Sequence, residues 1–178
     1  MVLAENITNN IAKIIQESVD IENLCQEKFS KSITGEDNLI YIDALAIAPK
    51  PSFTVTKLPT EKHYFNRGTE SGLESEWQIM VSFFGDFGAG QLLDDGFRTP
   101  EGARVDVNGI TTYTPSDTMR IIARLAGQAV NKKIGCIIPG VLVESFDVDA
   151  EDYYDATNGE VKSFVKIDLY KKSSIYNN

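Results

Sequence analysis

Few side chains in this sequence are suited to nucleophilic or metal chemistry. There is one histidine, His63, and there are two cysteines, Cys25 and Cys136, which lie far apart. Nucleophilic catalysis needs a nucleophile, a base beside it and a group that orients the base. His63 lies in a polar stretch and the cysteines in apolar ones, so we expect a solvated loop histidine and two reduced core cysteines. A disulfide between Cys25 and Cys136 is the alternative. Acid–base catalysis by a carboxylate pair stays open, but no pair stands out.

Two stretches have the composition of ligand sites but not the spacing. A glycine run at 85–90 follows an expected strand, yet a phosphate loop continues with Lys-Ser/Thr, whereas negative charge follows Gly90. Residues 147–155 are acidic, but a calcium loop would need glycine where Asp152 stands. We therefore expect no cofactor and no dedicated metal site. A weak cation site in the acidic stretch is the open alternative.

Composition narrows the function classes further. The chain has 178 residues, 42% hydrophobic and 24% charged, as in an ordinary globular protein that can bury its own core. Its net charge is −9, which argues against nonspecific nucleic-acid binding as the main activity. The longest apolar runs are far below the roughly 20 residues of a membrane-spanning helix, and residues 1–6 lack a signal-peptide pattern. We expect one domain over 1–178, made in a reducing cytoplasm, with no membrane partner and no specific nucleic-acid binding.

Two segments have the spacing of amphipathic helices. An apolar stripe starting at Ile7 predicts helix through the first thirty residues, with a break near Asp20 and an end at Gly35. A second helix is predicted over 115–130, where a Thr-Pro pair marks the start. Gly135 is its expected C-terminal cap.

The other periodic segments alternate as β-strands do. Strands are predicted at 39–47, 53–58, 76–84, 141–148 and 160–171. Residues 59–74 are expected to form a mobile loop, and residues 149–158 an acidic turn. Strands and helices that are grouped, and do not alternate singly, predict an α+β fold. We expect an antiparallel or mixed sheet with both helices on one face.

The segment 85–114 differs from its surroundings, since it holds six of the 13 glycines. Asn-Gly at 108–109, between alternating runs, is a strong hairpin signal because both residues accept positive φ. We predict a projecting loop and hairpin inserted in the domain. Aromatic and arginine side chains are enriched at interfaces, so the candidate contact residues are Phe87, Phe97, Arg98, Arg104 and Tyr113. The alternative is that these aromatics pack back onto their own domain.

As a whole, this arrangement resembles the tail terminator and tail-completion proteins of tailed bacteriophages. The likeness rests on the N-terminal helix and on the strand at 76–85, with its tryptophan and its Phe-Gly end. It rests also on the helix at 115–130 and on the final hairpin with a charged last strand at 161–169. In that family the second helix follows the Phe-Gly turn closely, whereas here residues 86–114 intervene. The finer assignment, to neck terminator, tail-completion protein or another collar component, therefore stays open.

The resemblance implies a virion structural protein without catalytic residues. Such proteins form rings, commonly hexameric, at the head-proximal end of the tail, where they end tail-tube growth and join the tail to the neck. The implied partners are further copies of the chain, the tail tube or sheath protein, and the neck or connector protein. The acidic charge suits a lumen that passes DNA without binding it, or serves only to keep the protein soluble. Another phage or contractile-injection assembly module, such as a baseplate or collar adaptor, is the alternative, followed by an unrecognised enzyme.

Overall fold

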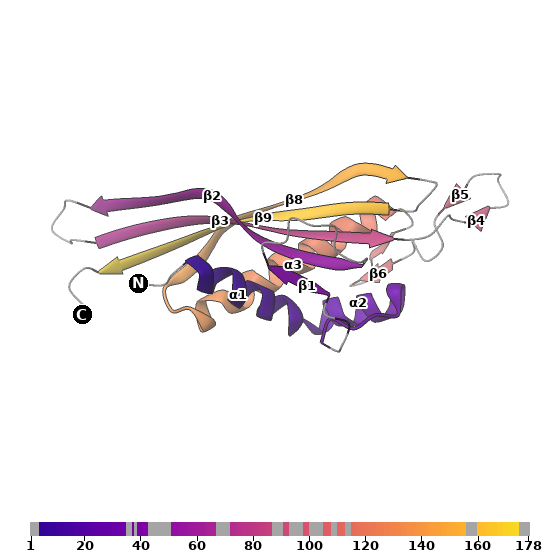
Figure 1. Cartoon of the computed structure of the whole chain (residues 1–178), viewed down its shortest axis with the longest axis horizontal. Helices are drawn as coiled ribbons and strands as arrows, with labels where there is room; N and C mark the ends of the chain where they lie inside the picture. The colour runs from indigo at the N-terminus through magenta and orange to yellow at the C-terminus, as the bar shows by residue number, and fades with distance from the viewer. Residues whose placement is uncertain are drawn as a thin grey trace.

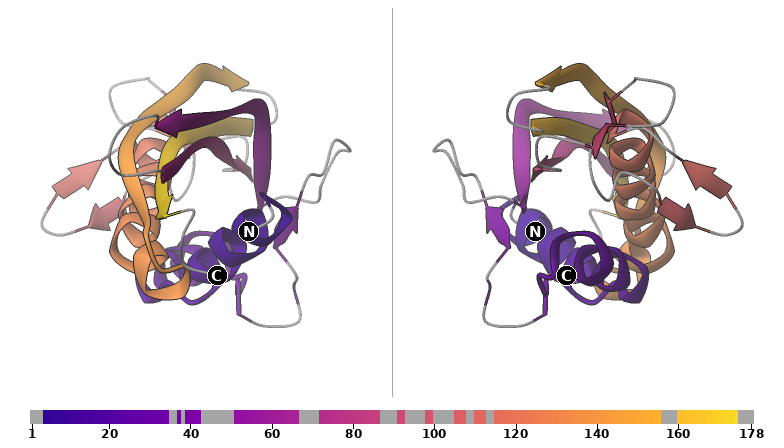
Figure 2. Two further views of the ribbon diagram at one scale, coloured as in Figure 1. Left: turned by 90° about the vertical axis from the view of Figure 1, so that its left-hand side faces the viewer. Right: turned by 90° about the vertical axis from the view of Figure 1, so that its right-hand side faces the viewer.

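The computed structural model describes residues 4–34, 37, 39–42, 51–66, 72–86, 91–92, 98–99, 105–107, 110–112, 115–155 and 160–174. Across these residues a five-stranded sheet forms one layer, and three helices form the other (Figure 1). Seen end-on, the twisted sheet curves over the helices, which lie together on one side of it (Figure 2). The predicted α+β class and the helices on one face are confirmed.

The elements are as follows. The helices are α1 (Ala4–Gln16), α2 (Val19–Phe29) and α3 (Pro115–Ile137). The large sheet contains β1 (Ile40–Ile42), β2 (Ser52–Asn66), β3 (Gly72–Asp86), β9 (Glu160–Ser174) and β8 (Val141–Asp155), in that spatial order. Two small sheets pair β4 (Gln91–Leu92) with β5 (Arg98–Thr99), and β6 (Val105–Val107) with β7 (Ile110–Thr112). The large sheet is mixed, because β1 is parallel to β2 and the other neighbours are antiparallel.

The N-terminal helical segment predicted from the sequence consists of two helices, α1 and α2. Both the position of the break between them and the end of the second helix differ from the prediction. The chain leaves helical geometry at Ser18, with φ −82° and ψ 109°, and not at Asp20. α2 ends at Phe29, well before Gly35. Ser30 takes the left-handed conformation, with φ 51°, and its N–H is directed to carbonyl groups of the last turn. A serine thus occupies the place for which the sequence suggested glycine.

The third helix starts where predicted but continues past both expected ends, Val130 and Gly135. A Cβ on Gly135 would lie 3.2 Å from the Val141 carbonyl oxygen, so glycine here allows close approach of helix and strand. The helix ends at Ile137, and Gly140, with φ 82°, supplies the positive φ needed for the turn into β8. The prediction of Gly135 as the helix cap was wrong.

Two stretches predicted as loop or turn are strands. Most of residues 59–74 belongs to β2 and β3, which pair in register from Glu61 opposite Trp77 to Asn66 opposite Gly72. Pro59 is accommodated because the register shifts there, between Lys57 and Glu61. The expected acidic turn at 149–158 is likewise strand up to residue 155. Among the described strands β8 is an edge of the sheet, and charged residues are common on edge strands.

The core lies between the sheet and the helices. The predicted inward face of the central strand β3 is buried, as is that of β9, and both join one apolar cluster with α1 and α3. The ring of Phe83 lies 4.5 Å from that of Phe53 and 5.7 Å from that of Phe29, measured between centroids. Buried members from the sheet include Trp77, Ile79, Val81, Val165, Ile167 and Leu169, and those from the helices include Ile7, Ile11, Ile14, Ile122, Ala126 and Val130. The strand alternation and the helix spacing in the sequence therefore mark the two surfaces that pack against each other in one core.

The predicted hairpin within the 85–114 segment is present as β6 and β7. Val107 pairs with Ile110, which leaves residues 108 and 109 as the connection between the strands. Neither this hairpin nor the pair β4–β5 is hydrogen-bonded into the large sheet. The small hairpins therefore contribute no strand to the main fold.

Candidate functional site

The most distinctive surfaces of the described fold are the two edges of its large sheet. β8 forms one edge and, among the described residues, is hydrogen-bonded to a strand only on its β9 side. Fifteen residues of backbone thus have one side unpaired by any described strand. Such an edge is a template for pairing with another chain.

The opposite edge of the sheet is only partly covered. β1 pairs with β2 over Phe53, Thr54 and Val55 alone. From residue 56 to residue 66 no described strand lies on the outer side of β2. Among the described residues, the two edges of the sheet are thus β8 and the second half of β2.

The two edges differ in charge. β8 carries six acidic residues and no lysine or arginine, whereas β2 carries two lysines and one glutamate. β8 also carries an exposed apolar side chain, Leu142, with 61% of its surface accessible. A large apolar side chain on an edge strand is the kind of feature that aggregation or specific docking uses.

A polar cluster links β2 to β3 on the helix-facing side of the sheet. The register places Glu61 opposite Trp77 and His63 opposite Ser75, so the four side chains share one face. Trp77 Nε1 donates to Glu61 Oε1 at 2.9 Å, and His63 Nε2 lies 3.0 Å from the same oxygen. His63 Nδ1 is 2.9 Å from the Ser75 hydroxyl. The expected loop was wrong, because His63 lies on β2 and bridges two side chains. Its side chain is solvent-exposed as expected, with 45% of its surface accessible.

The electrostatics of this cluster favour an ionised Glu61. A hydrogen bond from Lys57 lowers the pKa of Glu61 most strongly; partial burial opposes it, and the Trp77 hydrogen bond adds to the lowering. A histidine that donates from Nε2 to this carboxylate can accept the Ser75 proton at Nδ1. In space, Ser75, His63 and Glu61 thus follow one another in the order of a nucleophile, a base and a group that orients the base. It also serves as a cross-strand clamp beside the register shift of β2.

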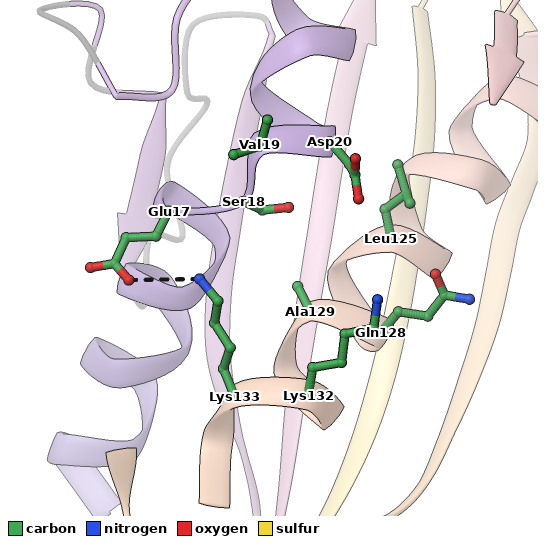
Figure 3. A pocket seen from close by; sticks show the side chains of 9 residues that line it. All are labelled: Glu17, Ser18, Val19, Asp20, Leu125, Gln128, Ala129, Lys132 and Lys133. Carbon is green, nitrogen blue, oxygen red and sulfur yellow. Dashed lines mark ion pairs between the residues drawn. The ribbon is translucent and has the colours of Figure 1, made fainter. Parts of the chain in front are cut away.

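A shallow hollow lies in the helical layer, between the junction of α1 with α2 and the outer side of α3 (Figure 3). Val19, Leu125 and Ala129 supply its apolar part, and Lys133 of the rim is ion-paired with Glu17 at 3.8 Å. Its volume is about 200 Å³, below the roughly 300–1,000 Å³ of ordinary ligand pockets. The mixed charges of its rim select no particular ligand.

The two cysteines lie on helices, Cys25 on α2 and Cys136 on α3, and differ in exposure. Both cysteines are free; Cys25 is buried as predicted, but Cys136 is exposed, because it lies on the outer side of the last turns of α3. Burial, helped by the charge of Glu22, raises the pKa of Cys25 to about 12, so its thiolate is not formed at neutral pH. Among the side chains that the structure describes, no three His, Cys, Asp or Glu are grouped to hold a metal ion.

Most of the contact residues expected from the sequence lie outside the described residues. These are Phe87, Phe97, Arg104 and Tyr113. Arg98 is placed only by its backbone, opposite Leu92 in the β4–β5 pair. Their role stays a prediction. The sheet edges were missed by sequence reasoning, although the alternation of β8 beyond Val148 was a signal for a longer strand.

The chain matches no known protein family, and no curated protein matches its sequence. Within the described part, no helix is both long enough and apolar enough to cross a membrane.

Proposed function

We propose that this chain is a structural subunit of a tailed-bacteriophage virion that assembles with copies of itself into a ring. The observation that supports the proposal best is the pair of edges on opposite sides of one sheet, β8 and residues 56–66 of β2, that no described strand covers. Two different surfaces that complement each other join copies head to tail, and such contacts close into rings when the rotation per copy divides a full turn. The resemblance noted from the sequence suggests six copies.

In this proposal the ring lies at the head-proximal end of the tail, ends growth of the tail tube and joins the tail to the neck. Its partners are the tail tube or sheath protein on one side and the neck or connector protein on the other. The subunit is made in the host cytoplasm, needs no cofactor and catalyses no reaction. The net charge of −9 fits a lumen that repels DNA phosphates, and it also fits plain solubility.

Electron microscopy of the purified protein tests ring formation. We expect closed particles of one diameter with a central opening; open filaments, or a field of separate subunits at every concentration, would contradict the proposal. Immunogold labelling of phage particles that carry the chain then tests its place. Label at the head–tail junction agrees with a terminator, whereas label at the far end of the tail favours a baseplate module.

A hydrolytic enzyme is the second candidate, because Ser75, His63 and Glu61 are hydrogen-bonded in the order of a catalytic triad. Turnover of a 4-nitrophenyl ester by the wild type and by Ser75→Ala tests it. Saturable turnover that falls at least tenfold in Ser75→Ala would support the enzyme. We expect wild type and variant to have the same weak background rate, because the cluster clamps two strands.

A further inference from the structure

We propose that neighbouring copies of the chain join by antiparallel addition of residues 141–146 of β8 to residues 57–63 on the outer edge of β2. This inference rests on the proposed function and names the contact that builds the ring. It uses no residue of the 85–114 segment. In this proposal the occupant of each edge is a second copy of this chain.

The strand directions make the contact antiparallel. β8 runs antiparallel to β9, β9 to β3, and β3 to β2. Three reversals leave β8 antiparallel to β2 within one subunit. When a second copy is placed beside the first by rotation about an axis along the strands, its β2 runs antiparallel to the first copy's β8. The sheet then continues through the contact with its ordinary hydrogen-bond pattern.

The two stretches lie at the same level of the sheet. His63 is opposite Ser75, which is opposite Lys171, which is opposite Val141. At the other end, Lys57 is connected in the same way to Phe146, through Ile79 and Ile167. Residues 57–63 and 141–146 thus occupy the same height on opposite edges. Past the Lys57 end, the edge of β2 is already occupied by β1, which excludes a longer contact in that direction.

The faces of the two edges match as well. At equal height Val141 of one copy meets His63 of the next, both on the helix-facing side, and Leu142 meets Lys62 on the other side. The side chain of Lys62 is 56% exposed, and its pairing with Glu76 is long, at 3.9 Å. A lysine stem can cover an apolar side chain while its ammonium reaches a carboxylate. In the neighbouring copy, Leu142 is the apolar side chain and the exposed Glu144 is the carboxylate that Lys62 would contact.

Cross-linking between copies tests this contact directly. We would place Leu142→Cys and Lys62→Cys in a chain in which the exposed Cys136 is changed to Ser. Within one subunit the two positions are three strands apart, about 14 Å, which is beyond the roughly 7 Å reach of a disulfide. A bond between them therefore joins two copies. The control pair combines Leu142→Cys with Asn23→Cys, at an exposed position of α2.

After mild oxidation we expect a ladder of linked copies up to the full ring in the test pair, at least tenfold stronger than in the control pair. Equal ladders in both pairs, or none in the test pair while light scattering reports an oligomer, would overturn the edge contact and leave the proposed function standing. A single-chain mass at every concentration would instead contradict both.

A charge exchange gives a second test without cysteines. Leu142→Lys places a positive charge against Lys62 of the neighbour, so we expect at least a tenfold weaker association. Because Leu142 is mostly exposed, the folded subunit should be unaffected. Adding Lys62→Glu to the same chain should restore association. An unchanged association in Leu142→Lys, or no recovery in the double variant, would count against the contact.

Discussion

At the scale of single residues, Gly127 shows how closely α3 packs on β8. A Cβ placed on Gly127 would lie 2.8 Å from Cδ2 of Phe146 and 3.1 Å from two further ring atoms. Atoms do not approach so closely without a shift of the ring. Glycine at this position therefore lets the Phe146 ring of β8 pack directly against α3, although glycine lowers the helix propensity of α3.

We predict that Gly127→Ala destabilises the fold. Overpacking costs about 1–3 kcal/mol, and the better helix propensity of alanine returns about 1 kcal/mol. We expect a net loss of about 1 kcal/mol in the free energy of unfolding, measured by urea denaturation. In a Phe146→Leu background the same change should be neutral or stabilising, because the ring is gone. Gly127→Ala at least as stable as wild type would show that helix and strand have room to separate.

The carboxylate of Glu22 on α2 accepts hydrogen bonds from residues 32 and 33, which follow the helix. Its Oε2 accepts from the Ile33 N–H at 2.7 Å, and its Oε1 accepts from the Ser32 hydroxyl at 2.8 Å. Partial burial alone would raise the pKa of Glu22, but these hydrogen bonds outweigh it and lower the pKa below the ordinary 4.5. The ionised form thus holds the chain that leaves α2.

The stability of the protein should therefore fall in acid. A pKa lowered by folding gives stability that is present above the unfolded value of 4.5 and is lost as the pH falls through the folded value. Glu61 and Asp37, whose pKa values are also lowered, contribute in the same direction. We expect Glu22→Gln to have a lower melting temperature near neutral pH and a shallower decline below pH 4.5. Thermal melts at several pH values measure both; parallel curves for variant and wild type would exclude this role.

At the scale of elements, the sequence was informative where one face of an element is buried. The alternation from Trp77 to Phe83 predicted the central strand, and the spacing from Ile122 to Val130 predicted α3, because both patterns follow a single apolar core. The outer half of β2 was missed because Pro59 and polar neighbours resemble a loop. An edge strand can hold such residues at a register shift and in contact with water.

The candidate site was less predictable than the fold. Which strands are edges depends on the spatial order of five strands, and local periodicity does not determine that order. The cluster around His63 arises only when the hairpin register brings Ser75 and Trp77 opposite residues 12 to 16 positions earlier. Contacts of this kind follow from tertiary pairing, so spacing along the chain did not reveal them.

The separate small hairpins lead to a prediction about the 85–114 segment. Figure 1 shows that β3 ends and α3 begins at the same side of the molecule, and the large sheet takes no strand from the small sheets. We expect a chain with residues 87–113 replaced by a short Gly-Ser linker to fold, with a circular dichroism spectrum and cooperative melt like those of the full chain. Its solution mass tells whether the segment adds a contact. Loss of cooperative folding would mean that the segment is part of the domain.

At the scale of the whole molecule, the sheet edges that no described strand covers are the basis of the proposed self-association. Edges that no strand covers usually need protection by bulges, charge or a partner. β8 has carboxylates along its length, which disfavour uncontrolled stacking of identical edges, whereas a β2 edge with lysines is a better neighbour. Charge thus disfavours the symmetric β8–β8 pairing and favours the head-to-tail contact that a ring requires.

Self-association is the central claim, and the solution mass of the purified full-length chain tests it most directly. Light scattering on a sizing column, at low and moderate salt and over a range of concentrations, gives that mass. We predict one discrete oligomer, near six times the 19.7 kDa of the chain. A mass of 19.7 kDa under every condition would contradict the account.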